Sequence, residues 1–321
     1  MDNLRGGILT FYNNFNSDPR TSKLMDSTSL YLASKKKPLG NGKKNFIRID
    51  GVYFHKFSSN NKANYFLNNY LLNRGIINNY NKCEKIIFQS KFSKEMFLKI
   101  VKPKSIKESI IIYNGCKEIL EYPHSFNKNK KLKIITCSVD HPTKRLHYFF
   151  ELEKKLKSQN IDFEITIITN LIDLKQRLLS KMKSFDNYFV KDSKIKILRN
   201  LSKTQVVTHL LNSNLYVSFS HIDPCPNSII EAISVGLPII APNSGSMHEL
   251  CLNDLLYNKQ INRDFLNLFQ YEKVDNLEVI KVSEKIELFM SNSSFFYENS
   301  IKYKKRFILE DMIDQYITFM K

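Results

Sequence analysis

The stretch SHIDPCPNSIIEAISVGLPIIAPNSG, residues 220–245, passes from a proline-rich loop to a helix-like run and then to an apolar, strand-like run. Pro226 suits the first helical position, because its missing N–H would have no partner there. Gly236 suits the end of the helix, and Pro238 prevents the helix from continuing. The stretch therefore predicts a loop, a helix and a strand in immediate succession.

The same alternation runs through the C-terminal half of the chain. Expected strands cover residues 131–139, 162–169, 194–200, 215–220 and 237–242, and expected helices cover 144–158, 171–182, 202–213 and 226–235. Ser202 is the expected N-cap of its helix. Strands separated by helices favour a parallel sheet with crossover helices, which is a doubly wound α/β domain.

The N-terminal third is less regular, but its pattern is also α/β. Expected strands cover 45–54, 83–90 and 109–115, and expected helices cover 64–82 and 93–100. Ser93 is the N-cap candidate of the second of these helices. The first strand is expected to run into a turn at Asp50 and Gly51.

A polar, lysine-rich stretch at 116–131 separates these two parts. It contains a proline and ends in a basic run, as linkers between domains often do. We therefore expect an N-terminal domain over 1–120 and a C-terminal domain over 121–300. The amphipathic run at 303–320 predicts one long closing helix, so that 301–321 forms a third segment.

Composition excludes several classes of protein. The 321 residues are 42% hydrophobic, which suffices for buried cores, and no apolar run reaches the ~18–20 residues that span a bilayer. No secretory signal pattern is visible at the N-terminus. The five cysteines are scattered without metal-ligand spacing, so neither a disulfide framework nor a metal site is expected, and a cytoplasmic location follows.

The net charge of +18 has two explanations. The excess is mainly lysine and is accompanied by many asparagines, a pattern that A/T-rich coding and a need for solubility produce without any binding role. The alternative is a peripheral attraction to an anionic membrane surface. The charge is diffuse and no nucleic-acid recognition motif occurs, so no nucleic-acid partner is expected.

The start of the helix at 226–235 is a candidate anion site. Asn227, Ser228 and Ile229 offer backbone N–H groups at the positive end of the helix, where a phosphate would be stabilised. This helix follows an expected parallel strand, and ligands of α/β sheets bind at the carboxyl ends of the strands.

Two acids flank this helix start. Glu231, about a turn and a half into the helix, can accept hydrogen bonds from two vicinal hydroxyls such as those of a ribose. Asp223, in the preceding loop, can meet a second polyhydroxyl group on the other side of the phosphates. A nucleotide-sugar has this order of groups. The competing explanation is structural, with Asp223 capping the helix and Glu231 interacting with its dipole.

The spacing Asp-x7-Glu, the run Asn-Ser-Ile-Ile-Glu-Ala-x4-Gly-Leu-Pro and the following Gly-x3-Glu-Leu resemble family 4 glycosyltransferases. These are retaining enzymes of the GT-B fold, in which two Rossmann-like domains face each other across a cleft. Their usual signature is Glu-x7-Glu, from which Asp223 departs by one methylene. The resemblance covers roughly 45–250 and implies a donor-ribose contact for Glu231 and a donor-sugar contact for Asp223.

The resemblance also implies roles for other residues. Lys144 would grip the donor diphosphate, and Arg145 is a candidate to replace an arginine that the family often has a few residues earlier. Arg199 and Leu201 would lie near the base of the nucleotide. On the acceptor side the candidates are Arg48, Asp50 and Gly51. The N-terminal domain is expected to be a shortened version of its counterpart in the family.

The activity implied is retaining, metal-independent transfer of a sugar from a UDP-sugar or GDP-mannose to a hydroxyl of a glycan, lipid-linked or protein acceptor. The nucleotide-sugar is a substrate, so no cofactor is expected. Three alternatives stay open: a catalytically inactive GT-B scaffold that binds sugar or nucleotide, a nucleotide-sugar epimerase of the same fold, and a basic nucleic-acid-binding protein.

Overall fold

The computed structural model describes residues 6–33, 35–52, 63–117, 119, 125–127, 130–169, 193–258 and 273–321. The chain divides into two compact units. The first comprises residues 1–117, 223–230 and 307–321, and the second comprises 118–222 and 231–306. The division therefore passes through the helix that the sequence places at 226–235.

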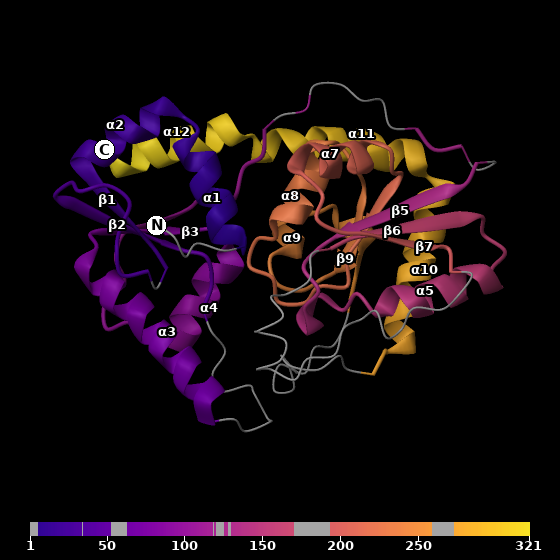
Figure 1. Ribbon diagram of the computed structural model, residues 1–321, viewed down its shortest axis with the longest axis horizontal. Coiled ribbons are helices and arrows are strands. Elements are labelled where there is room, and N and C mark those ends of the chain that lie inside the picture. Colours follow the sequence, from indigo (N-terminus) through magenta and orange to yellow (C-terminus); the bar gives the residue numbers. More distant parts are fainter. Residues whose placement is uncertain are drawn as a thin grey trace. The chain divides into compact units, whose positions relative to one another are not determined.

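The first unit contains a four-stranded parallel sheet in the order β1-β2-β3-β4 (Figure 1). Its strands are β1 (Thr28–Leu32), β2 (Lys44–Ile49), β3 (Lys85–Phe88) and β4 (Ser109–Ile111). Its helices are α1 (Gly6–Asn16), α2 (Pro19–Ser27), α3 (Ala63–Lys82), α4 (Lys91–Val101) and α12 (Leu309–Met320). Strand β2 ends at Ile49, before Asp50, so it is shorter than the expected strand over 45–54, and no turn is assigned at Asp50 and Gly51.

The core of the first unit joins both ends of the described chain. Phe11 and Phe15 of α1 pack with Tyr316 of α12, with ring centroids 5.3–5.4 Å apart. These rings belong to one buried cluster with Phe46 of β2 and Ile87 of β3. Helix α12, distant in sequence, thus closes the sheet of the first unit.

The second unit contains a six-stranded parallel sheet in the order β10-β9-β8-β5-β6-β7. Its strands are β5 (Leu132–Cys137), β6 (Phe163–Ile168), β7 (Ile195–Leu198), β8 (Leu215–Val217), β9 (Ile239–Pro242) and β10 (Leu256–Tyr257). The order reverses between β5 and β8, because β6 and β7 extend to one side and β9 and β10 to the other. Such a switch point is where open α/β sheets bind ligands.

Helices cover both faces of this second sheet. Helices α5 (Tyr148–Ser158) and α10 (Asn276–Ser291) pack together in a buried cluster that includes Phe149, Ile165 and Phe289. Helix α7 (Lys203–Leu211) lies on the opposite side of the sheet in Figure 1. The remaining helices are α8 (Asn227–Ser234), α9 (Met247–Leu250) and α11 (Ser293–Lys304). Two parallel α/β sheets confirm the predicted class.

Three predicted boundaries were wrong. Helix α4 is capped by Ser90 and not by Ser93, the expected cap. The side chain of Ser90 accepts a hydrogen bond from the amide of Ser93, which lies within the first turn of the helix. The helix expected at 144–158 begins only at Tyr148. The expected closing helix is two helices, because Phe307 and Leu309 form backbone hydrogen bonds with Cys116 of 2.9 and 3.0 Å that interrupt it.

Two further expectations concern helices. The helix predicted at 171–182 lies outside the described residues. Within the part of the chain that the structure describes, no helix combines the length and the apolar character needed to cross a bilayer.

Candidate functional site

Helix α8 follows β8 through a short loop. The helix begins at Asn227, one residue later than predicted, and Pro226 precedes it. The carbonyl of Pro226 accepts hydrogen bonds from the amides of Ile229 (3.1 Å) and Ile230 (3.2 Å). Ile229 is therefore a correction to the predicted anion site, because its N–H is occupied and its side chain is buried. Anion binding by the amides of Asn227 and Ser228 stays a prediction.

The other end of α8 is fixed by a glycine. Gly236 has a φ of +78°, the left-handed conformation that favours glycine. Its amide donates to Ile233 (2.8 Å), and the amide of Leu237 donates to Ala232 (3.1 Å). These two bonds form a Schellman motif, which confirms the predicted C-terminal end of the helix. Both ends of α8 are thus set by local sequence.

Glu231 of α8 lies in the second unit, near the carboxyl end of β5 and the start of α7. Burial raises the pKa of its carboxyl group, and the charge of Lys203 at the start of α7 opposes this rise. Burial raises the pKa of the thiol of Cys137, the last residue of β5, and the charge of Glu231 adds to this rise. Glu231 is therefore a partly desolvated acid at the switch point of the sheet.

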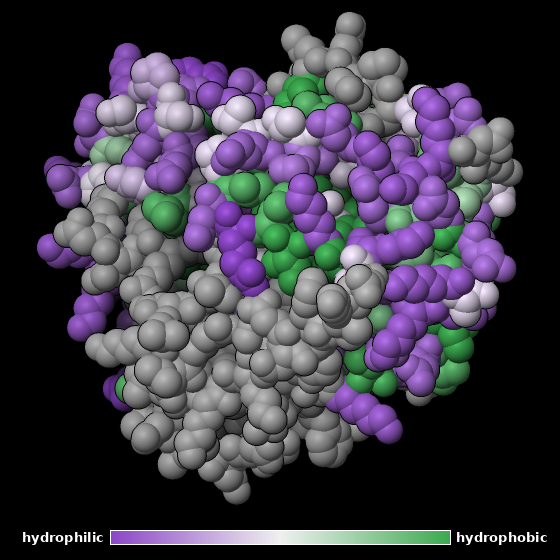
Figure 2. Space-filling model, turned by 45° about the vertical axis from the view of Figure 1, so that its right-hand side comes forward, coloured by the Kyte–Doolittle hydropathy of each residue, from purple (hydrophilic) through white to green (hydrophobic). Residues whose placement is uncertain are grey.

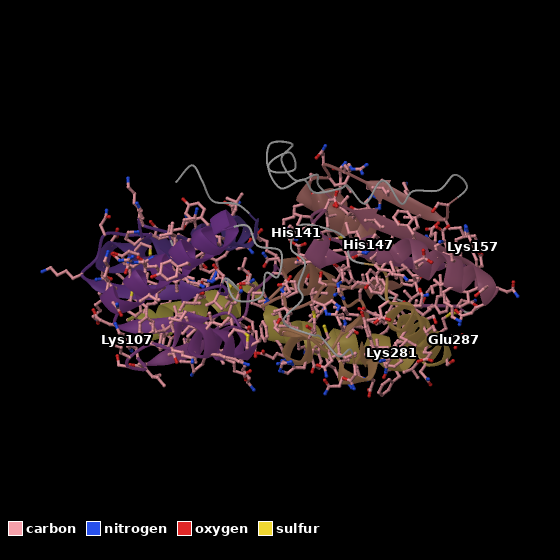
Figure 3. The ribbon with its side chains drawn as sticks, turned by 90° about the horizontal axis from the view of Figure 1, so that it is seen from below. Lys107, His141, His147, Lys157, Lys281 and Glu287 are labelled. Carbon is pink, nitrogen blue, oxygen red and sulfur yellow. The ribbon has the colours of Figure 1, made fainter. Side chains whose placement is uncertain are left out.

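The loop after β5 leads into a short 3-10 turn, Pro142–Lys144. His141 caps this turn by accepting a hydrogen bond from the amide of Thr143 (3.2 Å). Burial and, to a lesser extent, the charge of Lys144 lower the pKa of His141 to about 4, so the imidazole is neutral at pH 7. His141 precedes this turn in the chain and His147 follows it, and both are labelled in Figure 3. Lys144 is half-buried at the end of the turn, beyond the carboxyl end of β5.

Arg145 adopts a left-handed conformation with a φ of +53°, which ends the turn. Its guanidinium points into the second unit and forms an ion pair with Glu278 of α10 at 3.3 Å. It also contacts His221, whose Nε2 lies 3.1 Å from the other carboxylate oxygen of Glu278. Tyr257 donates a hydrogen bond of 2.9 Å to the same carboxylate. Arg145 thus holds a buried polar cluster, and its guanidinium is engaged there.

This cluster was not predicted, and no local signal reveals it. Glu278 lies 133 residues from Arg145 and 57 from His221. Burial of Tyr257 raises the pKa of its hydroxyl, and the neighbouring Glu278 carboxylate raises it further. Through His221, the cluster ties the loop after β5 to the loop after β8, so it fixes the two loops that meet at the switch point.

The predicted base-side residues follow β7. Arg199 and Leu201 are both half-buried, and Asn200 between them has a φ of +56°. Ser202 then caps α7 in a capping box: its side chain accepts a hydrogen bond from the amide of Gln205, and the side chain of Gln205 accepts one from the amide of Ser202. The predicted cap is confirmed, and Arg199 and Leu201 lie in the loop that leads to Lys203, the residue whose charge acts on Glu231.

In the first unit, Arg48 of β2 is a buried hub. Its side chain is 1% exposed and forms an ion pair with Asp50 at 2.6 Å. It donates hydrogen bonds to Asn114 (2.7 Å) and Gln89 (3.2 Å), and its guanidinium stacks 3.7 Å from the ring centroid of Phe11. Arg48 therefore orients its neighbours instead of meeting an acceptor itself, which corrects the prediction of a direct contact.

Asn114 links this hub to the start of α8. Its amide donates to the side chain of Asn227 (2.7 Å) and to the carbonyl of Cys225 (3.2 Å). Gly51 lies against the same loop, because a Cβ placed on it would be 3.3 Å from Pro224. The structure thus brings Gly51 and the Arg48 hub together with the loop that carries Asp223. Asn114 was missed in the sequence, where it stands only in an Asn-Gly pair.

The two acids near these loops differ in environment. Burial raises the pKa of Asp50, and the charge of Arg48 opposes this rise. Asp223 is half-buried, and its carboxylate accepts a hydrogen bond of 3.4 Å from the amide of Cys225. Asp223, Asn227 and Ser228 belong to the first unit, whereas Glu231 and Lys144 belong to the second.

No group of three or more His, Cys, Asp or Glu side chains suited to hold a metal ion occurs among the residues that the structure describes.

Residues 119–255 match the family model described as Glycosyl transferases group 1. A search of the curated proteins gives no match.

Solved structures resemble the fold over most of this chain. The pneumococcal O-GlcNAc transferase GtfA, in complex with UDP and GlcNAc, has a TM-score of 0.62 at 13% identity, over 86% of this chain and 52% of that one. For TarM the TM-score is 0.62 at 15% identity, over 98% and 58%. For Anabaena HepE with UDP and glucose it is 0.61 at 13% identity, over 86% and 71%.

These similarities define the fold. Two parallel α/β units that match these structures show that the chain has the GT-B fold, as the sequence predicted. The segment that matches the family model contains both Lys144 and Glu231. The chain spans 52–58% of the length of GtfA and TarM.

Proposed function

We propose that this protein is a retaining glycosyltransferase that moves a sugar from a nucleotide-sugar, a UDP-sugar in the first instance, to a hydroxyl of an acceptor. The main support is α8, which carries a partly desolvated Glu231 one turn after two amides at its N-terminus. The resemblance to group 1 glycosyltransferases and to structures solved with UDP adds support. GDP-mannose is the second donor to test.

In this proposal Glu231 accepts hydrogen bonds from the two ribose hydroxyls of the donor. A half-buried carboxylate suits this role, because hydrogen bonds to an ionised acceptor are the stronger ones. Asp223 accepts hydrogen bonds from hydroxyls of the donor sugar. Its side chain is one methylene shorter than the glutamate usual in the family, so its carboxylate extends less far from the backbone. Arg199 and Leu201 contact the base.

The reaction breaks the bond between the anomeric carbon and the diphosphate oxygen and forms a bond from that carbon to the acceptor oxygen. The acceptor proton passes to the departing phosphate, so no protein base is assigned. Negative charge grows on the diphosphate, and Lys144 with the amides of Asn227 and Ser228 would stabilise it. Preorganised charge stabilisation of this type is usually the largest single contribution to catalysis.

Arg145 and Arg48 act as positioning residues in this proposal. Arg145 fixes the turn that presents Lys144, and Arg48 fixes Asp50 and Asn114, which in turn orients Asn227. On the acceptor side, Asp50 and Gly51 remain the proposed contacts. The acceptor is a glycan, a lipid-linked sugar or a protein.

The proposal is tested by incubating the protein with a panel of UDP-sugars and GDP-mannose and measuring nucleotide release. Turnover of one donor, with an α-configured product from an α-linked donor by NMR, is the expected result. Nucleotide binding without turnover would instead identify a binding scaffold, and an altered nucleotide-sugar would identify an epimerase. If no donor is bound and none is turned over, the proposal is overturned.

A further inference from the structure

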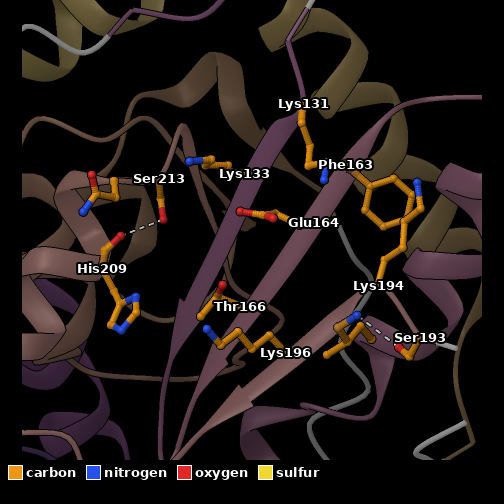
Figure 4. Close-up of a pocket in the computed structure, with 12 residues that line it drawn as sticks. Lys131, Lys133, Phe163, Glu164, Thr166, Ser193, Lys194, Lys196, His209 and Ser213 are labelled. Atoms are coloured by element: carbon orange, nitrogen blue, oxygen red, sulfur yellow. Dashed lines mark hydrogen bonds between the residues drawn. The ribbon is translucent and has the colours of Figure 1, made fainter. Parts of the chain in front are cut away.

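The second unit has a basic groove at the opposite edge of its sheet from the proposed donor site. The groove lies at the amino ends of β5, β6 and β7, on the side of α7 (Figure 4). Its volume is about 450 Å³, and a hollow of about 560 Å³ adjoins it. The two hollows share lining residues, so they form one groove; the shared residues are Lys131, Lys133, Asn212 and Ser213.

The side chains on the floor of the groove are unusual for a parallel sheet. Such sheets are normally apolar on both faces. Here one face carries Lys133 of β5, Glu164 and Thr166 of β6 and Lys196 of β7, which rise on the same side in Figure 4. The neighbouring residues of β6 on the other face, such as Ile165, are fully buried. The polar residues of one face therefore occur in a sheet whose other face is well packed.

Positive charge dominates this groove. Four lysines line the first hollow, namely Lys131, Lys133, Lys194 and Lys196, against a single carboxylate, Glu164. Lys194 forms an ion pair of 3.5 Å with Asp162, whereas the ammonium groups of the other three have no ion pair within the described part of the chain. Three uncompensated cations thus face one hollow.

The lysines are spaced along the groove. Lys131 and Lys133 lie two residues apart at the start of β5, and Lys194 and Lys196 lie two apart at the start of β7. By strand geometry each pair is separated by about 6.6 Å, and β5 and β7 by roughly 10 Å. Such an array fits several anionic groups along one chain better than it fits a single phosphate.

The other groove residues favour a glycan among the linear polyanions. Thr166, Asn212 and Ser213 offer side-chain oxygens, and Glu164 offers a carboxylate, all of which accept hydrogen bonds from sugar hydroxyls. A single-stranded nucleic acid would need aromatic platforms for its bases. Of the two phenylalanines that line the groove, Phe163 is 1% exposed, and Phe126 is half-buried with its ring centroid 5.8 Å from that of Phe289, so neither offers an open platform.

A lipid surface fits this groove poorly. Peripheral membrane binding uses exposed apolar side chains beside basic residues. On the face shown in Figure 2 hydrophilic residues dominate the described surface of the molecule, so polarity alone does not mark a site. What distinguishes the groove is that its lysines lie in a hollow, where a chain can enter and a bilayer cannot.

We propose that this groove, defined by Lys131, Lys133, Lys194 and Lys196, binds an acidic polysaccharide through its repeated anionic groups. It is a second binding site, separate from the strand ends that carry Lys144 and Glu231. Binding here does not depend on the proposed transfer reaction. If both sites operate, the groove would raise the local concentration of a polymeric acceptor.

The test measures binding of an oligogalacturonate hexasaccharide to the full chain at about 0.15 M salt, where weak surface attraction is screened. The double variant Lys133→Gln/Lys196→Gln is expected to bind about tenfold more weakly, by analogy with the loss of two phosphate contacts. The matched control is Lys273→Gln/Lys302→Gln, which removes the same charge from exposed positions of the same unit and is expected to bind within about twofold of the parent.

Several results would overturn the proposal. Equal loss in both double variants, or no loss in either, would show that the hexasaccharide senses only net charge or binds elsewhere. Tighter, lysine-dependent binding of a thymidine hexanucleotide, or of phosphatidylserine vesicles, would assign the groove to nucleic acid or membrane. UDP binding by the groove variant, measured in parallel, should be unchanged, so the outcome is independent of the donor site.

Discussion

Glu278 is the partner on which the buried cluster of the second unit depends. Its carboxylate contacts Arg145, His221 and Tyr257, and its side chain is 1% exposed. Arg145, next to Lys144 in sequence, resembled a ligand-binding residue because only its neighbours in the chain were visible. Its actual partners come from distant parts of the sequence, which explains why local patterns did not reveal them.

Replacing Glu278 with alanine is expected to destabilise the protein by about 3–5 kcal/mol, because a buried guanidinium would lose its counter-ion. Glu284→Ala, at an exposed position of the same helix, should change stability by less than about 0.5 kcal/mol. Denaturant unfolding measures both. A small effect of Glu278→Ala would contradict the structural role given to this cluster.

His141 makes the stability depend on pH. Its pKa is lowered to about 4 in the folded protein from 6.5, so the unfolded state binds the extra proton between these values. The contribution of neutral His141 to the free energy of unfolding is complete above pH 6.5. It is lost as the pH falls toward 4, and the loss amounts to up to about 3 kcal/mol.

His141→Asn keeps a side chain that can cap the turn but does not titrate. Its free energy of unfolding should therefore fall less between pH 7 and pH 4 than that of the parent. Unfolding by urea at both pH values gives the comparison. Parallel pH profiles of the two proteins would show that His141 is not responsible.

At the scale of single elements, local sequence determined the ends of some helices well. Ser202 and Gly236 act on groups within four residues, so their roles were predictable from the chain alone. The interruption near Ile308 was not predictable, because it depends on backbone pairing with Cys116, almost 200 residues earlier. The amphipathic pattern of 303–320 continues across this break and gave no sign of it.

The left-handed Gly236 gives a test of the motif that ends α8. Gly236→Ala is expected to cost about 1–2 kcal/mol, because a Cβ is disfavoured at a φ of +78°. Gly236→Asn should cost less, since asparagine tolerates this conformation better. Thermal unfolding distinguishes the two, and equal stability of all three proteins would argue against the assigned helix end.

For the whole molecule, the order of strands explains why the site could be predicted in part. Strands β5 and β8 pair in parallel, with Ile134 opposite Leu215, which lies 81 residues later in the chain. The carboxyl ends of the two strands are therefore adjacent, and the residues that follow them converge at one switch point. Lys144 and the loop before α8 were found because each follows an expected strand. Asn114 and the basic groove were not, because their meaning depends on which surfaces the fold leaves uncovered.

The proposed chemistry makes a prediction for the complete protein. Lys144 and two helix amides are proposed to stabilise the diphosphate, so transfer should be insensitive to EDTA within about twofold, whereas Lys144→Gln should lower kcat by about 100-fold. The nucleotide-release assay measures both. Loss of activity with EDTA that Mg²⁺ restores would show that a metal ion takes part.

The binding of UDP tests the central claim most directly. UDP should raise the melting temperature of the parent protein, because a ligand specific for the native state stabilises it. Glu231→Gln should weaken UDP binding at least about tenfold through loss of charged hydrogen bonds to the ribose, whereas Glu284→Gln should leave it unchanged. Equal UDP affinity of the parent and Glu231→Gln would contradict the assignment of this helix as a nucleotide site.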